Sequence, residues 1–255
     1  MIGSVHVISF SPCGGTENVM QAITRDIPLP KHEYNITLPG DRTRELRFSR
    51  NDLVIMGFPV YGGNMPVHFS SLIAHLKGAG TPLVMVAVYG NREYEGAFLD
   101  MHEGVSANGF TPVAAIAAVA QHSGAPRIAT GRPDADDREK LAQFGLQALN
   151  KAQAGGEGLA APGAHRAWDL PAGIDIWPNT NMDVCTKCGQ CAGVCPMGAV
   201  SDDGAATDNG KCIVCAACLK YCPAKARRFG NAETMKEYAA HLAHAVARKE
   251  AVLFV

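Results

Sequence analysis

The sequence predicts an α/β protein in which a doubly wound parallel sheet of five strands is followed by a small, cysteine-rich α+β domain. Three observations support this prediction. Short apolar runs alternate with amphipathic segments over residues 1–153, as in a parallel sheet that is covered by helices. Residues 154–180 contain five glycines and three prolines, which indicates a linker. Eight of the nine cysteines then fall within residues 181–229.

The individual elements follow from the spacing of apolar residues. Runs of strand length lie at residues 5–10, 33–38, 53–58, 83–88 and 113–119. Helical spacing is found at residues 16–26, 67–76, 97–107 and 138–150. Asp136 or Asp137 is expected to cap the last of these helices. Residues 230–255 are expected to pack on the first domain as a tail and a helix capped by Asn231, whose apolar face comprises Met235, Tyr238, Leu242, Ala245 and Val246.

The eight cysteines form two copies of one spacing, C-x2-C-x2-C-x3-C-P. The first copy comprises Cys185, Cys188, Cys191 and Cys195, and the second comprises Cys212, Cys215, Cys218 and Cys222. This run holds cubane iron–sulfur clusters in bacterial ferredoxins, where the fourth cysteine of each run ligates the other cluster. We therefore predict one [4Fe–4S] cluster on Cys185, Cys188, Cys191 and Cys222. A second is predicted on Cys212, Cys215, Cys218 and Cys195.

Paired cysteines also occur in zinc sites and in disulfides. Zinc takes four ligands and seldom uses this repeated three-plus-one spacing. Disulfides suit secreted chains, whereas the start of this sequence reads as a strand and not as a targeting segment. Because all eight thiolates are used, no iron is left open, and the clusters are expected to conduct electrons and not to bind a substrate.

The first predicted strand runs into a turn rich in hydroxyl groups and glycine. Such a turn between a strand and its helix binds phosphate, because backbone N–H groups point at the anion. The spacing is neither a dinucleotide fingerprint nor a triphosphate loop, and no Lys or Arg lies within residues 9–18. The turn therefore favours a single phosphate monoester. Its candidate residues are Ser9, Ser11, Pro12, Cys13, Gly14, Gly15 and Thr16.

Two further loops follow predicted strands. Ligands of doubly wound sheets bind at the carboxyl ends of the strands, where each of these loops places an aromatic residue beside glycine. The loop after the third strand supplies Pro59, Val60, Tyr61, Gly62 and Asn64. The loop after the fourth supplies Tyr89, Gly90, Asn91, Arg92 and Tyr94. Both loops are interpreted as parts of one cofactor site with the first turn.

These residues resemble the flavodoxins. In that family an S/T-x-T-G-x-T turn holds the phosphate of FMN, and residues 11–16 match it except that Cys13 replaces the middle threonine and Pro12 has no N–H. With the cysteine runs included, nearly the whole chain resembles the flavodoxin–ferredoxin fusions of anaerobes. The resemblance implies strand order 2-1-3-4-5 and FMN in residues 1–153, and two [4Fe–4S] clusters in a ferredoxin domain at residues 181–229.

The combination predicts an electron-transfer iron–sulfur flavoprotein. It would couple a one-electron carrier, either a protein or another low-potential donor, to FMN and onward to a redox partner protein. One alternative is an FMN-dependent reductase of a small oxidant or corrinoid, with a proton donor among His68, His75, His122 and Tyr94. Another is a redox sensor. The sequence names no catalytic residue, because it offers no nucleophile, paired carboxylates or nicotinamide site.

Charge and hydropathy exclude several classes of partner. The net charge of −1 predicts no nucleic-acid binding, and the absence of a long apolar run predicts no membrane span. A cytoplasmic location in an anaerobe is expected, and a homodimer is left open. Lys225, Arg227 and Arg228 are interpreted as part of a solvated face of the cysteine-rich domain.

Overall fold

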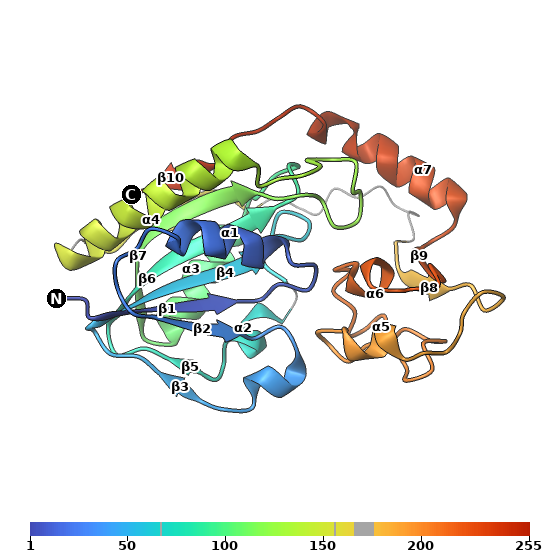
Figure 1. Ribbon diagram of the computed structural model, residues 1–255, viewed down its shortest axis with the longest axis horizontal. Coiled ribbons are helices and arrows are strands. Elements are labelled where there is room, and N and C mark those ends of the chain that lie inside the picture. Colours follow the sequence, from blue (N-terminus) through green and yellow to red (C-terminus); the bar gives the residue numbers. More distant parts are fainter. Residues whose placement is uncertain (67, 156, 166–175) are drawn as a thin grey trace.

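The computed structural model describes residues 1–66, 68–155, 157–165 and 176–255. Its centre is a six-stranded sheet of order β10-β7-β6-β4-β1-β2 (Figure 1). The strands are β1 Ser4–Ser9, β2 Lys31–Asn35, β4 Asp52–Pro59, β6 Thr81–Tyr89, β7 Phe110–Val119 and β10 Val252–Phe254. All pairs are parallel except β10 with β7. Without β10 the order is 2-1-3-4-5, which confirms the predicted α/β fold.

Alternate side chains of the central strands enter two separate cores. In β6, Leu83 and Met85 belong to the core on one face of the sheet, while Val84 and Val86 belong to the core on the other. This is the two-fold alternation of a strand. Because both faces are covered, residues 83–88 of this strand are all apolar and do not alternate with polar residues.

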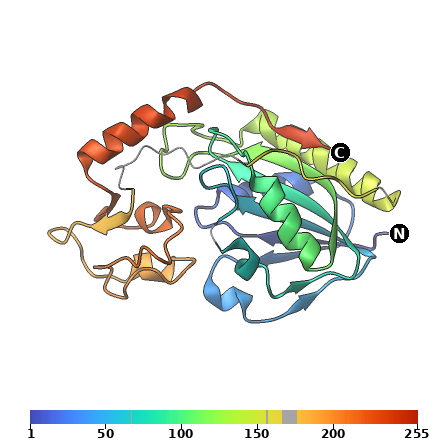
Figure 2. The same ribbon diagram turned by 180° about the vertical axis from the view of Figure 1, so that it is seen from behind.

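Two helices cover each face of the sheet. On one face lie α1 Gly15–Thr24 and α4 Ala135–Gln153, and on the other lie α2 Phe69–Leu72 and α3 Ala97–Ala107 (Figures 1 and 2). The cap of α4 is Asp134, whose carboxylate accepts from the N–H of Asp137 at 3.1 Å. The predicted cap at Asp136 or Asp137 was therefore wrong. The carboxylate of Asp137 is instead buried in a pair with Arg132.

The predicted helix at residues 67–76 is a single turn. It ends at Leu72, and Leu76 begins a short strand, β5 Leu76–Lys77, which pairs with β3 Leu46–Arg47. Leu72, Ile73 and Leu76 are all buried in one core. Their spacing was thus a correct sign of burial but not of a helix, and residue 67 lies outside the described residues.

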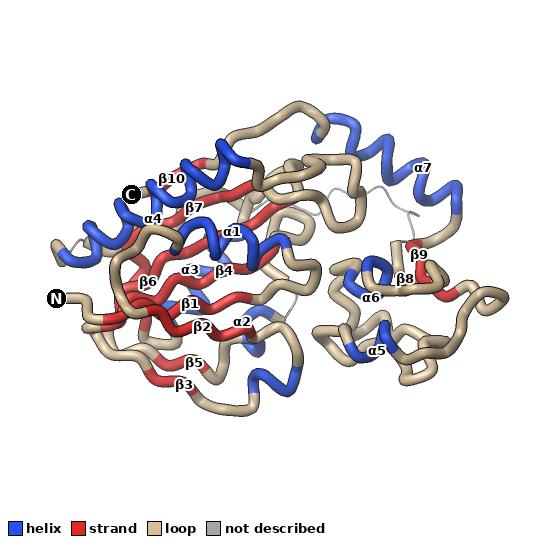
Figure 3. The backbone as a smooth tube through the Cα atoms, viewed as in Figure 1, coloured by secondary structure: helices blue, strands red, loops and turns tan. Residues whose placement is uncertain are grey.

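The cysteine-rich segment is mostly loop (Figure 3). Its regular elements are β8 Pro178–Thr180, α5 Gln190–Gly193, α6 Ala217–Lys220 and β9 Arg227–Phe229, with β8 and β9 antiparallel. So small a segment has little apolar core of its own, and metal sites replace the core in domains of this size.

The segment after residue 230 returns to the sheet (Figure 1). Helix α7, Ala232–His241, is capped by Asn231, whose side-chain oxygen accepts from the N–H of Thr234 at 2.9 Å. A 3₁₀ turn, Leu242–Ala245, continues it. Leu242 and Ala245 are buried with Ile128. Val246, expected on the same face, is exposed because regular helix ends before it. Among the described residues, no helix has the length and apolarity needed to cross a bilayer.

Candidate functional site

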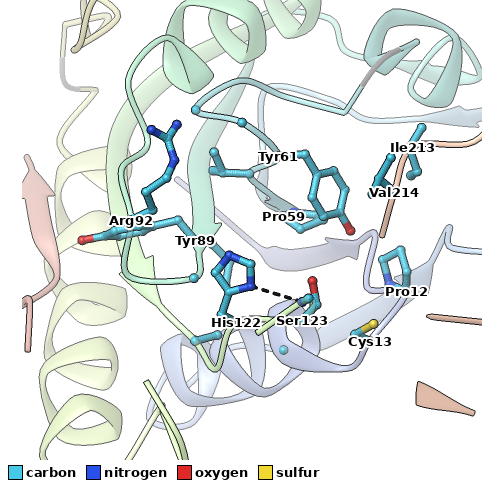
Figure 4. A pocket seen from close by; sticks show the side chains of 18 of the residues that line it. Pro12, Cys13, Pro59, Tyr61, Tyr89, Arg92, His122, Ser123, Ile213 and Val214 are labelled. Carbon is cyan, nitrogen blue, oxygen red and sulfur yellow. Dashed lines mark hydrogen bonds between the residues drawn. The ribbon is translucent and has the colours of Figure 1, made fainter. Parts of the chain in front are cut away.

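A cavity of about 470 Å³ lies at the carboxyl ends of the parallel strands, within the size range of small-molecule sites. The loops after β1, β4, β6 and β7 form one side (Figure 4). The cysteine-rich segment and α7 form the other. Among the predicted cofactor residues, those that line it are Ser11, Pro12, Cys13, Gly15, Thr16, Pro59, Val60, Tyr61, Gly62, Asn64, Tyr89, Gly90 and Arg92.

Four predicted residues are not among those lining the cavity. Ser9 pairs in β1, and Gly14 takes a left-handed conformation (φ 77°) as the cap of α1. Tyr94 packs against Tyr89 and Phe98. The side-chain carboxamide of Asn91 differs most clearly from its predicted place in the cofactor site. It donates to the carbonyls of residues 245 and 247 and accepts from the N–H of residue 249. Asn91 therefore anchors the C-terminal segment.

Several lining residues were missed by the sequence analysis. The loop after β7 supplies Gln121, Ser123 and Gly124, together with His122, which the sequence analysis named only as a candidate proton donor. Ligands of doubly wound sheets bind at the carboxyl ends of the strands, and this loop also follows a strand, so the same argument could have identified it. The opposite wall comes from distant segments, for which the local sequence gives no sign: Trp177, Cys212, Ile213, Val214, Phe229, Tyr238, His241 and Leu242.

The turn after β1 is arranged for an anion. Ser11 is fixed by two bonds, because its N–H donates to Thr37 Oγ1 at 2.8 Å and its Oγ accepts from the N–H of Glu17 at 2.9 Å. No hydrogen bond within the described residues occupies the N–H groups of Cys13, Gly15 and Thr16. Free N–H groups at the start of a helix bind phosphate. The turn therefore fits the phosphate group of FMN.

The cysteine-rich segment touches this turn directly. Lys220 Nζ donates to the carbonyl of Cys13 at 2.7 Å, and Cys13 Sγ donates to the carbonyl of Cys215 at 3.2 Å. A cation thus reaches the turn although the turn's own sequence has none. Burial raises the pKa of the Cys13 thiol to about 12, so this thiol stays protonated and unreactive near neutral pH.

The imidazole of His122 is a fixed neutral donor. Its Nδ1 accepts from the N–H of Gly124 at 3.1 Å, the dashed line in Figure 4, and from the N–H of Ala125, also at 3.1 Å. The hydrogen therefore resides on Nε2. Burial lowers the pKa of His122 to about 4. Among the proton donors considered for a reductase, His122 lines the cavity, whereas His68, His75 and Tyr94 are not part of its wall. Near neutral pH, however, His122 is uncharged.

This depressed pKa predicts a pH dependence of stability. As the pH falls from about 6.5 towards about 4, the unfolded chain binds a proton on His122 that the folded chain excludes, so the free energy of unfolding decreases. The H122Q variant should lose this part of the slope. Urea midpoints at about pH 7 and about pH 5 measure it. An unchanged slope in H122Q would contradict the assignment.

The eight cysteines line two small cavities. Cys185, Cys188, Cys191 and Cys222 surround one. Cys195, Cys212, Cys215 and Cys218 surround the other. Each cavity thus takes three thiols from one run and the fourth from the other run, as in the predicted ligand sets. Within the described residues, no three His, Cys, Asp or Glu side chains converge as they would on a single metal ion.

Backbone N–H groups point at four of these sulfurs. Ala199 N donates to Cys195 Sγ at 3.2 Å and Ala226 N to Cys222 Sγ at 3.3 Å, with bonds of 3.4 Å to Cys185 and Cys212. Hydrogen bonds to the charged form of an acid favour that form. The loops are therefore suited to thiolates, which are the form that ligates iron.

Comparisons with known proteins match the cysteine-rich segment to a family model and the first part of the chain to solved structures. Residues 178–201 match the family model of the 4Fe-4S binding domain. No curated protein matches. A flavodoxin from the domain Archaea is 13% identical and covers 59% of this chain and 99% of its own, with a TM-score of 0.42. The flavodoxin of Streptococcus pneumonia TIGR4 is 18% identical over 59% and 99%, with a TM-score of 0.38.

A further similar structure is the azoreductase from Bacillus anthracis str. Sterne, which is 14% identical over 60% of this chain and 100% of its own, with a TM-score of 0.34. Such distant likenesses leave the fold assignment to the strand order described above. The chain therefore has a flavodoxin-like domain followed by a 4Fe-4S ferredoxin domain.

Proposed function

We propose that the protein transfers electrons between two [4Fe–4S] clusters and FMN, and so couples a one-electron carrier to a flavin and onward to a partner protein. One observation carries this proposal. Cys212 and Ile213 line both the large cavity and the small cavity of the second cysteine set. The flavin site and that cluster site would therefore share a wall.

The residues present fit FMN. Residues 11–16 offer free N–H groups for the phosphate, and the loops after β4, β6 and β7 surround the remaining volume with Tyr61, Tyr89 and His122. When bound, FMN supplies a centre that accepts one or two electrons. The neutral Nε2–H of His122 would donate a hydrogen bond to it, and the apolar wall at Ile213 and Val214 would exclude water.

The two cysteine sets differ in their surroundings, and this difference suggests which cluster meets the external carrier and which meets the flavin. Each set contains two buried cysteines, but the set containing Cys215 and Cys218 has no exposed one and lies beside the large cavity. The other set includes the exposed Cys188. A cluster in the set that includes Cys188 would exchange electrons with an external carrier, and a cluster in the set beside the large cavity would exchange them with the flavin.

Anaerobic purification followed by rapid reduction tests the proposal. The protein should contain about eight irons and about one FMN per chain. In stopped-flow reduction by a reduced ferredoxin, cluster absorbance should bleach before the flavin is reduced. Four irons, bound zinc, or a flavin that fills before the clusters would refute the pathway. A reduced flavin that cannot pass electrons to any acceptor protein would favour a sensor.

A further inference from the structure

Arg227 lies between the two cysteine cavities. It begins strand β9 and is 5% exposed. Its side chain lines the cavity of Cys185, Cys188, Cys191 and Cys222. Its Nη2 also donates to Cys218 Sγ, at 3.6 Å, in the other set. One guanidinium therefore contacts both prospective cluster sites, contrary to the prediction that Arg227 belongs to a solvated face.

Within the described part of the chain, Arg227 pairs with no carboxylate. Nη1 donates to Thr180 Oγ1 at 2.7 Å and to the carbonyl of Gly204 at 3.3 Å, and Nη2 donates to Thr207 Oγ1 at 2.6 Å. Apart from the Cys218 sulfur, these acceptors are neutral oxygens. The buried Nε has no partner among the described residues.

Such a group is unfavourable unless something nearby compensates it. A buried charge needs an opposite charge, and a buried donor without an acceptor destabilises the fold. The cavity that Arg227 lines and the cavity whose Cys218 it contacts are together lined by the eight cysteines of the cluster motifs. Thiolate-ligated cubane clusters carry net negative charge and sulfur acceptors, which match both the unpaired charge and the free Nε–H.

We propose that Arg227 is a cation shared by the two clusters, which raises the reduction potential of both. The inference rests on the two-cluster part of the proposed function. Cluster potentials depend on nearby charge and on hydrogen bonds to sulfur. Reduction adds one electron, and hence one negative charge, to a cluster. A fixed positive charge beside both clusters therefore favours their reduced forms.

The alternative is that Arg227 only joins strand β8 to the loop at residues 204–207. Two substitutions separate charge from this mechanical role. R227M removes the charge and the hydrogen bonds. R227K keeps the charge but loses the planar fork of donors. R228M is the matched control, because Arg228 is the neighbouring residue, is exposed, and donates to Asn179 Oδ1.

The experiment is an EPR-monitored redox titration of the anaerobic holoprotein, after its iron has been counted. In R227M the equilibrium constant for reduction of each cluster should fall about tenfold, which is about 59 mV per one-electron couple. R227K should shift less than R227M, and R228M should match the wild type. An iron-replete R227M whose two couples coincide with those of R228M would overturn the proposal.

Failure of R227M to load iron is also informative. If R227M still binds FMN while R227K loads iron as the wild type does, the site needs the charge and the proposal is supported. If both variants bind FMN and neither loads iron, cluster binding requires the planar set of guanidinium donors and not the positive charge. The shared-cation role is then refuted. A wild-type protein with a single couple would instead refute the two-cluster function itself.

Discussion

The C195S variant is expected to lose the cluster beside the flavin site, although Cys195 belongs to the cysteine run of the other cluster. Cys195 lines the cavity of Cys212, Cys215 and Cys218. Serine is a poor ligand for iron, so the iron content should fall from about eight to about four per chain. Reduction of the flavin by a reduced ferredoxin should then become very slow, because the cluster that shares a wall with the flavin site is gone.

The matched variant is C222S. Its cysteine lies in the second run but lines the cavity of the first set. It should also lose about four irons while keeping the cluster beside the flavin, so that this cluster and the flavin still equilibrate in a redox titration. EPR and iron analysis identify the cluster that remains. The opposite result would be loss of the Cys188 cluster in C195S and of the cluster beside the flavin in C222S. It would show that the fourth cysteine of each run ligates the cluster of its own run.

The G145A variant is expected to lower stability by about 3 kcal/mol. Gly145 lies in α4, where a Cβ would overlap the carbonyl oxygen of Ile23 in α1. A backbone oxygen cannot rotate away, so the helices must separate and loosen the core around Phe144 and Leu141. Helix propensity alone predicts the opposite sign, since alanine favours a helix over glycine by about 1 kcal/mol.

The sign of the change therefore decides between packing and propensity. Urea unfolding of the anaerobic holoprotein, followed by circular dichroism, gives the shift of the midpoint. The control is G40A, because a Cβ at Gly40 meets no atom within 4 Å and its φ is ordinary. G40A should unfold at the wild-type midpoint or slightly above it. A midpoint for G145A at or above that of the wild type would contradict the expected close contact.

The sequence was informative where chemistry is local. Strands such as residues 83–88 were recognised because both of their faces are buried, and the cofactor loops because they follow strand ends. Burial did not distinguish a turn from a helix at Leu72 and Leu76. Contacts formed across the chain left no local pattern. Lys220 contacts Cys13, which lies 207 residues away in the chain. Likewise, nothing in the sequence distinguishes the buried Arg227 from the exposed Arg228 next to it.

Strand β10 changes how the cysteine-rich segment is connected. The segment leaves the flavodoxin-like domain after α4 and returns to the same sheet through β10, which pairs with β7. It is thus tethered at both ends, like an inserted loop. Double tethering raises the effective concentration of one group at another. A cluster held in this way would compete for the flavin against freely diffusing carriers by proximity alone, without any need for a tight external binding site.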